Sequence, residues 1–195
     1  MACFMWFFAL LGFFGLNSWI TVLLKDHGYS IVKSVGFVTL ITTGGIPGFA
    51  LAAYGLEKLG RKPTTVLFLL MCAVTAYIYG TASDQVVFSV GGLDATRLFC
   101  AGWIMQFFMF GMWSCLYAYT PELYPTRARS TGAGLASAVG RIGAIISPIV
   151  IGYIIKDVGA YGVFALGAGS FVLAALVVLT MGVETRGEVL EQVSS

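Results

Sequence analysis

The sequence predicts an all-α integral membrane protein, built as a bundle of six transmembrane helices. Of its 195 residues, 58% are hydrophobic and 10% are charged, and the mean hydropathy is +0.91. Soluble domains carry about 25% charged residues, so this chain has too few polar side chains to cover a soluble core. A helix needs about 20 apolar residues to cross the hydrocarbon core. Six segments fit this need, at residues 2–24, 35–56, 64–81, 97–119, 133–155 and 163–182.

The first two segments contain glycine residues that can affect the geometry of the helix. In the first, the run LLGFFGLNSW contains Gly12 and Gly15, which we expect to loosen the helix and to permit gating. In the second, the run TTGG precedes Pro47. This run indicates a flexible or closely packed stretch of helix, and close packing is the preferred interpretation.

The fourth segment has Gln106 as its only amide, among several aromatic residues. Gln106 lies two turns before Trp113, so both side chains can share one face. A buried amide needs hydrogen-bond partners, which either a solute in a cavity or a neighbouring helix can supply. Trp103 and Trp113 either pack against neighbouring helices or line that cavity. Tyr117 and Tyr119 near the end of the segment fit an interfacial aromatic belt.

The fifth segment, GLASAVGRIGAIISP from residue 134, is apolar except for Arg141. This arginine lies about ten residues into the segment, roughly 15 Å deep. A cation at that depth costs about 2.5–3.5 kcal/mol on insertion scales and is expected to face a bundle interior or an aqueous cavity. None of the six segments contains Asp or Glu. Its partner is therefore a backbone carbonyl, a group outside these segments or a ligand, so both a structural and an anion-binding role stay open.

Small residues surround Arg141. Gly132, Ala136, Gly140 and Ala144 recur every four residues, a pattern that favours close contact between helices. Ser137 lies one turn before Arg141, on an adjoining stripe of the helix. The sequence therefore predicts a helix that packs closely on one face and carries a cation beside that face.

The chain is predicted to divide into the membrane bundle at residues 1–182 and a cytoplasmic tail at residues 183–195. The charges in the loops predict the orientation of the bundle. One side of the membrane receives Lys58, Arg61, Lys62, Arg127, Arg129 and Arg186. The other side receives Lys25, Lys33, Arg97 and Lys156. Positive charge concentrates in cytoplasmic loops, so the first side is predicted to be cytoplasmic, with both chain ends inside.

Three stretches on the predicted cytoplasmic side carry both acids and bases. They read EKLGRKP from residue 57, YTPELYPTRARSTG from residue 119 and VETRG from residue 183. Exposed ion pairs contribute only about 0–1 kcal/mol each, a magnitude that suits a latch that has to open. The candidate residues of this gate network are Glu57, Lys58, Arg61, Lys62, Glu122, Arg129, Glu184 and Arg186.

These three stretches resemble motifs of the major facilitator superfamily of transporters. EKLGRK is similar to the family loop G-x-x-x-D-R-x-G-R-K, with Glu57 in place of Asp and Lys58 in place of Arg. PELYPTRAR resembles the element E-x6-R, and VETRG resembles P-E-T-x-G with Val183 in place of Pro. The resemblance covers essentially the whole chain and is greatest for the general-substrate branch of sugar porters, organic-ion transporters and metabolite:proton symporters.

The resemblance implies that this chain is the C-terminal six-helix half of a twelve-helix fold, with a solute site between two halves. It implies that the gate network closes the cytoplasmic side in the outward-facing state, and that an arginine such as Arg141 marks the handling of anions. It also places cavity-lining residues on the first segment. The candidates for the substrate cavity are Arg141, Gln106, Asn17, Ser137, Trp103 and Trp113.

The predicted function is secondary transport of a small organic solute, an organic anion or another metabolite, by alternating access in the lipid bilayer of a plasma or bacterial inner membrane. A coupling proton is a further candidate partner, as is either the missing N-terminal half or a second copy. The alternatives are a sugar or organic-cation transporter, and a truncated remnant that does not transport, because apolar sequence follows Met1 directly.

Other classes of protein fit the sequence poorly. A six-span intramembrane serine protease needs a membrane serine together with a membrane histidine, whereas the lone His27 lies in a loop, and no catalytic residues are assigned. A channel would need rings of acids or paired half-helices, which the pattern lacks. The four cysteines have neither CxxC nor zinc spacing, so no metal or cofactor is predicted. Basic residues form no patch for nucleic acid.

Overall fold

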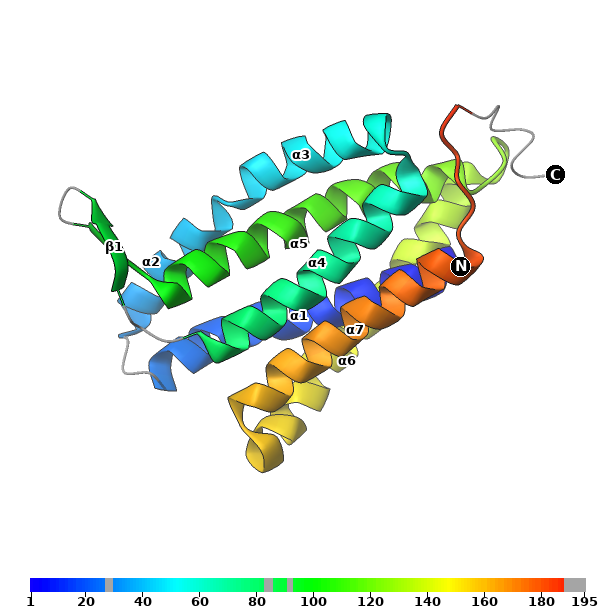
Figure 1. Ribbon diagram of the computed structural model, residues 1–195. Helices are drawn as coiled ribbons and strands as arrows, with labels where there is room; N and C mark the ends of the chain where they lie inside the picture. The colour runs from blue at the N-terminus through cyan, green and yellow to red at the C-terminus, as the bar shows by residue number, and fades with distance from the viewer. Residues whose placement is uncertain (27–29, 83–85, 91–92, 188–195) are drawn as a thin grey trace.

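The computed structural model describes residues 1–26, 30–82, 86–90 and 93–187, and these form helices and one small hairpin (Figure 1). His27 lies outside the described residues. The elements are α1 (Ala2–Asp26), α2 (Ile31–Thr42), α3 (Gly45–Lys58), α4 (Arg61–Thr81), β1 (Val86–Val90), β2 (Leu93–Thr96), α5 (Arg97–Glu122), α6 (Arg129–Val158) and α7 (Ala160–Met181).

The predicted six-helix membrane bundle is confirmed. Within the described part of the chain, 6 helical stretches are long and apolar enough to cross a membrane, with α2 and α3 together forming the second. Neighbouring helices pack side by side in the order α3, α5, α4, α7, α1 and α6. The start of α1 and the end of α7 lie at the same end of the bundle (Figure 1). We call this the charged end, because the α3–α4 turn and the tail after α7 lie there too.

The second membrane-crossing stretch tightens at Thr43 and Gly44, between α2 and α3. Here the backbone hydrogen bonds span three residues rather than four, as in the 3.1 Å bond from the Gly44 N–H to the Ile41 carbonyl. Gly44 faces Trp103 of α5, and Gly45 faces the ring of Phe110. The TTGG run is therefore a site of close packing against α5, which confirms the preferred interpretation of its sequence.

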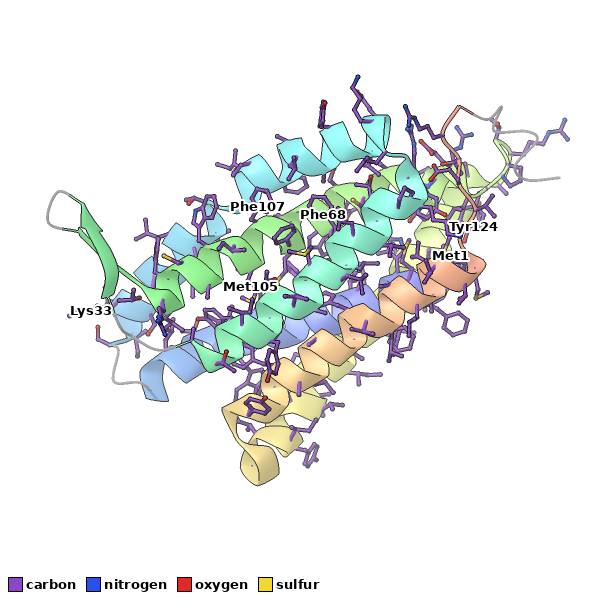
Figure 2. All side chains as sticks on the ribbon, in the orientation of Figure 1. Met1, Lys33, Phe68, Met105, Phe107 and Tyr124 are labelled. Carbon is purple, nitrogen blue, oxygen red and sulfur yellow. The ribbon has the colours of Figure 1, made fainter. Side chains whose placement is uncertain are left out.

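Two apolar layers hold the centre of the bundle. α4 and α5 meet around Phe68 and Met105, which are 3% and 0% exposed, and both lie between these helices in Figure 2. α1 and α7 meet around Leu16 and Phe171, which are both fully buried. Lipid tails are as apolar as these side chains, so the layers stabilise the bundle through close van der Waals packing.

The connection from α4 to α5 differs from the simple loop that the sequence suggests. The strands β1 and β2 pair in antiparallel fashion, with Val90 opposite Leu93 and Val86 opposite Thr96. The hairpin lies at the end of the bundle opposite the charged end (Figure 1). β-Branched residues such as those in VVFSV favour extended backbone, and here the hairpin leads directly into the N-cap of α5, where the Thr96 hydroxyl accepts from the Phe99 N–H.

Replacing Gly48 by alanine is expected to destabilise the bundle, because the added methyl group would collide with the Phe107 backbone carbonyl of α5. Overpacking of this kind costs roughly 1–3 kcal/mol. Thermal unfolding in detergent micelles, followed by fluorescence, measures the effect. Gly169→Ala is the matched control, because nothing lies within 4 Å of its added methyl group. Equal unfolding midpoints for the two variants would contradict the close contact between α3 and α5.

Candidate functional site

The carboxylate of Glu184 organises the charged end of the bundle. Its two oxygens accept the backbone N–H groups of Arg61 at 2.8 Å and Lys62 at 3.0 Å, in the first turn of α4. They also accept the N–H groups of Thr185 and Arg186, both at 3.0 Å. The first-turn amides of a helix have no partner within the helix, and a carboxylate there also interacts favourably with the helix dipole. Glu184 therefore fastens the tail to the beginning of α4.

Gly60 makes this arrangement possible. Its backbone φ is +109°, a conformation that favours glycine. A Cβ atom at this position would also lie 2.7 Å from Glu184 Oε2. The glycine in the EKLGRK motif is therefore required both by the turn between α3 and α4 and by the approach of the tail.

Arg61 and Glu122 form the ion pair of the charged end. The Arg61 Nε lies 2.9 Å from Glu122 Oε2, and its Nη2 lies 3.0 Å from Oε1, so the contact is bidentate. Arg61 Nη1 donates to the Leu56 carbonyl at 3.0 Å. The side chains are 26% and 21% exposed, respectively. A bidentate and partly buried pair is more strongly oriented than an exposed one, so this contact fixes α4 against the end of α5.

Two residues of the tail and of α5 join this network without having been predicted for it. The Thr185 hydroxyl donates to Glu122 Oε2, and the Tyr119 hydroxyl donates to the Val183 carbonyl. Tyr119 is fully buried, so its predicted place in an interfacial belt is wrong, whereas Tyr117 is exposed. Thr185 lies inside the VETRG motif, which was the available signal.

The remaining candidates of the gate network make fewer contacts. The Arg186 guanidinium donates to the Lys58 carbonyl, whereas Lys62 contributes its backbone N–H rather than its ammonium group. The Glu57 side chain is exposed and has no hydrogen-bond partner among the described residues. Arg129 does not pair with Glu122, whose oxygens bond Arg61 and Thr185. The Nε and Nη2 atoms of Arg129 are buried without a hydrogen-bond partner in the described part of the chain.

Two amides meet inside the bundle, between α1 and α5. The Gln106 Nε2 donates to Asn17 Oδ1 at 2.8 Å, and the Asn17 Nδ2 donates to the Phe13 carbonyl at 3.0 Å. Gln106 is 1% exposed, and its Oε1 accepts no hydrogen bond from any described residue. The structure thus shows the interhelical hydrogen bond for Gln106 that the sequence left as an alternative. The bond adds a polar contact to the aromatic contacts between α1 and α5.

An aromatic cluster lies between α1 and α5, closer to the charged end. Trp113 packs edge-to-face on Trp6 at 6.0 Å and on Phe13 at 5.3 Å, and it stacks with Tyr117 at 5.6 Å. The Trp6 Nε1 donates to the Thr120 hydroxyl at 2.7 Å. Trp103 lies apart from this cluster, where its Nε1 donates to the Thr43 hydroxyl at 3.3 Å.

Arg141 projects from the side of α6 that faces away from α1. α6 packs on α1 through Gly140, which lies against Trp6 and Leu10, and through Ser147, whose hydroxyl donates to the Leu11 carbonyl. The small-residue contact is therefore confirmed at Gly140, and Gly143 extends it toward the Phe7 carbonyl. Ala136 is fully buried and Ala144 packs against the core. Arg141 is exposed and Ser137 is half-buried. Among the residues that the structure describes, none forms a hydrogen bond or an ion pair with the Arg141 guanidinium.

These features define an integral, multi-pass membrane protein whose charged loops converge at one end of a six-helix bundle. Residues 1–195 match the family model described as "Sugar (and other) transporter". The chain therefore belongs to this family of transporters, and its predicted membership of the major facilitator superfamily is confirmed.

Named relatives agree with this assignment. The chain is 37% identical over 189 residues to the "Niacin transporter NiaP" of Acinetobacter baylyi, which covers 96% of this chain and 41% of that protein. It is 35% identical over 192 residues to a Bacillus subtilis protein that bears the name niacin/nicotinamide transporter NiaP, covering 98% of this chain and 46% of that one. The chain thus spans less than half the length of these relatives.

A solved structure shows the same fold. The proton:xylose symporter XylE, bound to 6-bromo-6-deoxy-D-glucose, matches with a TM-score of 0.66 at 19% sequence identity. The match covers 99% of this chain and 42% of the XylE chain. The six helices therefore correspond to one part of a larger transporter fold.

Replacing Glu122 by glutamine is expected to destabilise the charged end, because Arg61 then loses its charged partner. We expect a loss of about 1–2 kcal/mol, between the value for an exposed pair and that for a charged hydrogen bond in the interior. The matched control is Glu57→Gln. It removes one negative charge at the same end of the bundle, from an exposed side chain that has no hydrogen-bond partner among the described residues. The free energy of unfolding, from denaturation in mixed micelles, should change only for Glu122→Gln. A similar loss in both variants would show a general charge effect.

The amide pair is expected to behave as a coupled unit. Asn17→Leu or Gln106→Leu alone leaves one amide without its partner, whereas the double variant removes both. The coupling energy should be about 0.6–1.7 kcal/mol, as for other hydrogen bonds between membrane helices. A cycle of Asn17→Leu with Thr180→Val, a residue that bonds only its own helix, should be additive. Additivity in the first cycle would mean that the amide bond contributes nothing measurable.

Proposed function

We propose that this chain is the C-terminal half of a secondary transporter that moves a small organic anion, of the niacin type, across a membrane by alternating access. The observation that supports the substrate class most directly is Arg141, an exposed cation in the middle of an otherwise apolar helix. Both relatives described above have niacin in their names. Niacin is a pyridine carboxylate, so an exposed cation and an aromatic cluster on the same half suit its two chemical features.

The position of Arg141 supports a place in a solute cavity. It lies 12 residues into α6, which corresponds to about 18 Å along the helix axis. α6 uses its opposite face for α1, so the guanidinium group points away from the packed interior of this half. An arginine at this depth requires water, a counter-ion or a polar partner. A cavity between two halves of a transporter supplies such surroundings and concentrates anions there.

The aromatic cluster between α1 and α5 supplies rings for the same proposed solute. Gly140, next to Arg141 in the chain, lies against Trp6, and Trp6 contacts both Trp113 and Tyr117. Tyr117 is exposed, so the cluster reaches the surface of this half. Aromatic rings pair in offset or edge-to-face geometry. We therefore assign Arg141 to the carboxylate of the solute, Trp113 and Tyr117 to its ring, and Ser137 to a supporting polar role.

The remaining cavity candidates have supporting roles in this proposal. Gln106 and Asn17 hold α1 and α5 at a fixed separation through their hydrogen bond. The unpaired Gln106 Oε1 is an acceptor for a water molecule or a solute donor when the bundle opens. Trp103 anchors the tight turn of the second membrane-crossing stretch through Thr43.

The charged end forms the cytoplasmic gate in this proposal. Glu184, Glu122 and Arg61 hold the ends of α4, α5 and α7 together as one rigid unit. Exposed Glu57 and Lys58 are then the groups that meet the N-terminal half in the outward-facing state. Arg129, whose Nε and Nη2 atoms are buried in this half, stays a predicted member of the network. Contacts of this kind contribute little each and can break during every transport cycle.

Proton coupling would require an acid from outside this bundle. In the described helices, the carboxylates of Glu57 and Glu122 lie at helix ends and none occupies the membrane interior. We therefore place any coupling acid in the N-terminal half. A second copy of this chain as the missing half is the competing arrangement.

The first measurement is the size of the protein that contains this chain. A tag at the C-terminus of the chromosomal gene and a blot of the membrane fraction would give this size. A band near 20.8 kDa would favour a second copy, or a remnant that does not transport. A band about twice that size would favour a twelve-helix transporter, in which the uptake test below can be made directly.

Arg141→Ala is expected to abolish uptake of radiolabelled niacin while the amount of folded membrane protein stays near normal. Arg141→Lys should keep part of the uptake, because it retains the charge and loses the planar guanidinium group. Arg127→Ala, at an exposed arginine in the connection from α5 to α6, is the matched control and should transport normally. Loss of folded protein in Arg141→Ala would show that Arg141 is structural. Uptake of a sugar or an organic cation in place of niacin would overturn the assignment of an anionic solute.

A further inference from the structure

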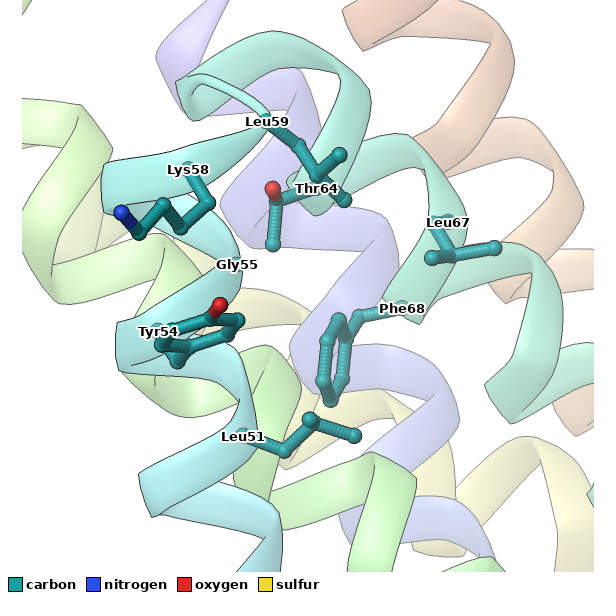
Figure 3. A pocket seen from close by; sticks show the side chains of 8 residues that line it. All are labelled: Leu51, Tyr54, Gly55, Lys58, Leu59, Thr64, Leu67 and Phe68. Atoms are coloured by element: carbon teal, nitrogen blue, oxygen red, sulfur yellow. The ribbon is translucent and has the colours of Figure 1, made fainter.

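Two apolar grooves flank α4 at the charged end. The first lies between α3 and α4, has a volume of about 360 Å³ and includes Leu51, Tyr54 and Phe68 in its walls (Figure 3). The second lies between α4 and α7, has a volume of about 370 Å³ and includes Val66, Leu70 and Leu179. Leu67 lines both grooves and is 48% exposed. The two grooves therefore share one exposed leucine as a common wall.

A lysine lines each groove at its charged end. Lys58 belongs to the groove between α3 and α4, and Lys62 belongs to the groove between α4 and α7. Within the described residues, neither ammonium group has a hydrogen-bond or ion-pair partner. The two nearest acids of the network are engaged elsewhere, because Glu184 accepts four backbone N–H groups and Glu122 accepts Arg61 and Thr185. Exposed Glu57 is the one acid next to Lys58 in the chain.

A buried hydroxyl provides a second polar feature in the first groove. Thr64 lines this groove and is fully buried, and its Oγ1 has no hydrogen-bond partner among the described residues. Figure 3 shows Thr64 at the head of the groove, beside Lys58 and Leu59. An unpaired buried hydroxyl is costly, so this position favours an occupant that offers an acceptor just below a negative charge.

We infer that the two grooves bind the acyl chains of an anionic phospholipid, whose phosphate group lies between Lys58 and Lys62. A phospholipid has two apolar chains for the two grooves and ester carbonyls that can accept from the Thr64 hydroxyl. Its phosphate lies beyond the ester carbonyls, where the lysines are. The outer face of α4 continues with exposed apolar side chains, Leu70, Val74 and Ile78, which suit contact with lipid tails along the rest of the helix. The site is distinct from the face that carries Arg141.

This lipid site connects the bilayer with the gate network. Lys58 and Lys62 border the turn that Glu184 caps, and the Lys58 carbonyl accepts the Arg186 side chain. A phosphate held by both lysines would therefore stabilise the turn between α3 and α4 from its outer side. On the predicted cytoplasmic side, anionic lipids and membrane-proximal lysines attract each other.

The test places a fluorescent reporter between the grooves. Leu67→Trp adds an indole at the shared wall, and its fluorescence is measured as the difference from the unaltered chain in reconstituted vesicles. Dibrominated phosphatidylglycerol should quench the added indole at lower mole fraction than dibrominated phosphatidylcholine. We expect a preference of about fivefold for each lysine at low salt, falling as salt screens the charges.

Charge variants show whether the lysines cause this preference. Lys58→Gln with Lys62→Gln should bring the quenching by the two lipids to the same level. Lys33→Gln with Lys156→Gln, at exposed lysines near the other end of the bundle, should leave the preference unchanged. Equal quenching by both lipids in the starting protein would overturn the anionic site. Absence of quenching by either lipid would also overturn it, because protein would then cover the grooves.

A second measurement covers the case in which Leu67→Trp does not fold. The unaltered chain and the Lys58→Gln, Lys62→Gln variant are purified from vesicles with equal amounts of both lipids, and native mass spectrometry counts the bound molecules. Selective retention of phosphatidylglycerol by the unaltered chain alone supports the inference. Equal retention by both proteins contradicts it. Neither assay involves solute transport, so its outcome is independent of the proposed function.

Discussion

The arrangement of the charged end depends on the hydrogen bonds that the Glu184 carboxylate accepts. It accepts two N–H groups from the start of α4 and two from the tail, so one side chain joins segments more than 120 residues apart in the sequence. With the tail fixed in this way, Thr185 reaches Glu122 and Arg186 reaches the Lys58 carbonyl. Arg61 then completes the contact between α4 and α5. The motifs thus act together because Glu184 fills the unpaired amides of a helix N-terminus.

Most of the membrane fold can be predicted from the sequence, because each apolar segment has to satisfy its own backbone hydrogen bonds within lipid. Two local features cannot be predicted in that way. The tight turn at Thr43 and Gly44 depends on contact with Trp103 and Phe110, which lie about 60 residues away in the chain. The hairpin between α4 and α5 depends on pairing of Val90 with Leu93, and that short polar and apolar region carried no strong periodic signal.

The candidate site can be predicted less completely. The spacing of residues in the sequence shows which side chains share a helix face, but it does not show which helix that face contacts. Arg61, Glu122 and Glu184 come together as their motifs suggest, whereas Arg129 lies outside the ion pair and Thr185 donates to Glu122. Gln106 and Asn17 were separate candidates, and their direct hydrogen bond follows from how α1 approaches α5. Which side chains form hydrogen bonds between helices depends on how the helices pack, and a local sequence pattern does not show this packing.

The strengths of these contacts divide the bundle into parts that stay together and parts that can move. Gly140 and Ser147 hold α6 on α1 through backbone-close contacts, and the pair of Arg61 with Glu122 is bidentate and partly buried. Separating such surfaces would expose polar groups to lipid, which costs several kcal/mol. Arg141, Glu57 and Lys58 are instead exposed polar groups with side chains free of described partners. The rocking proposed above would therefore leave these internal contacts intact and move this six-helix bundle as a single body.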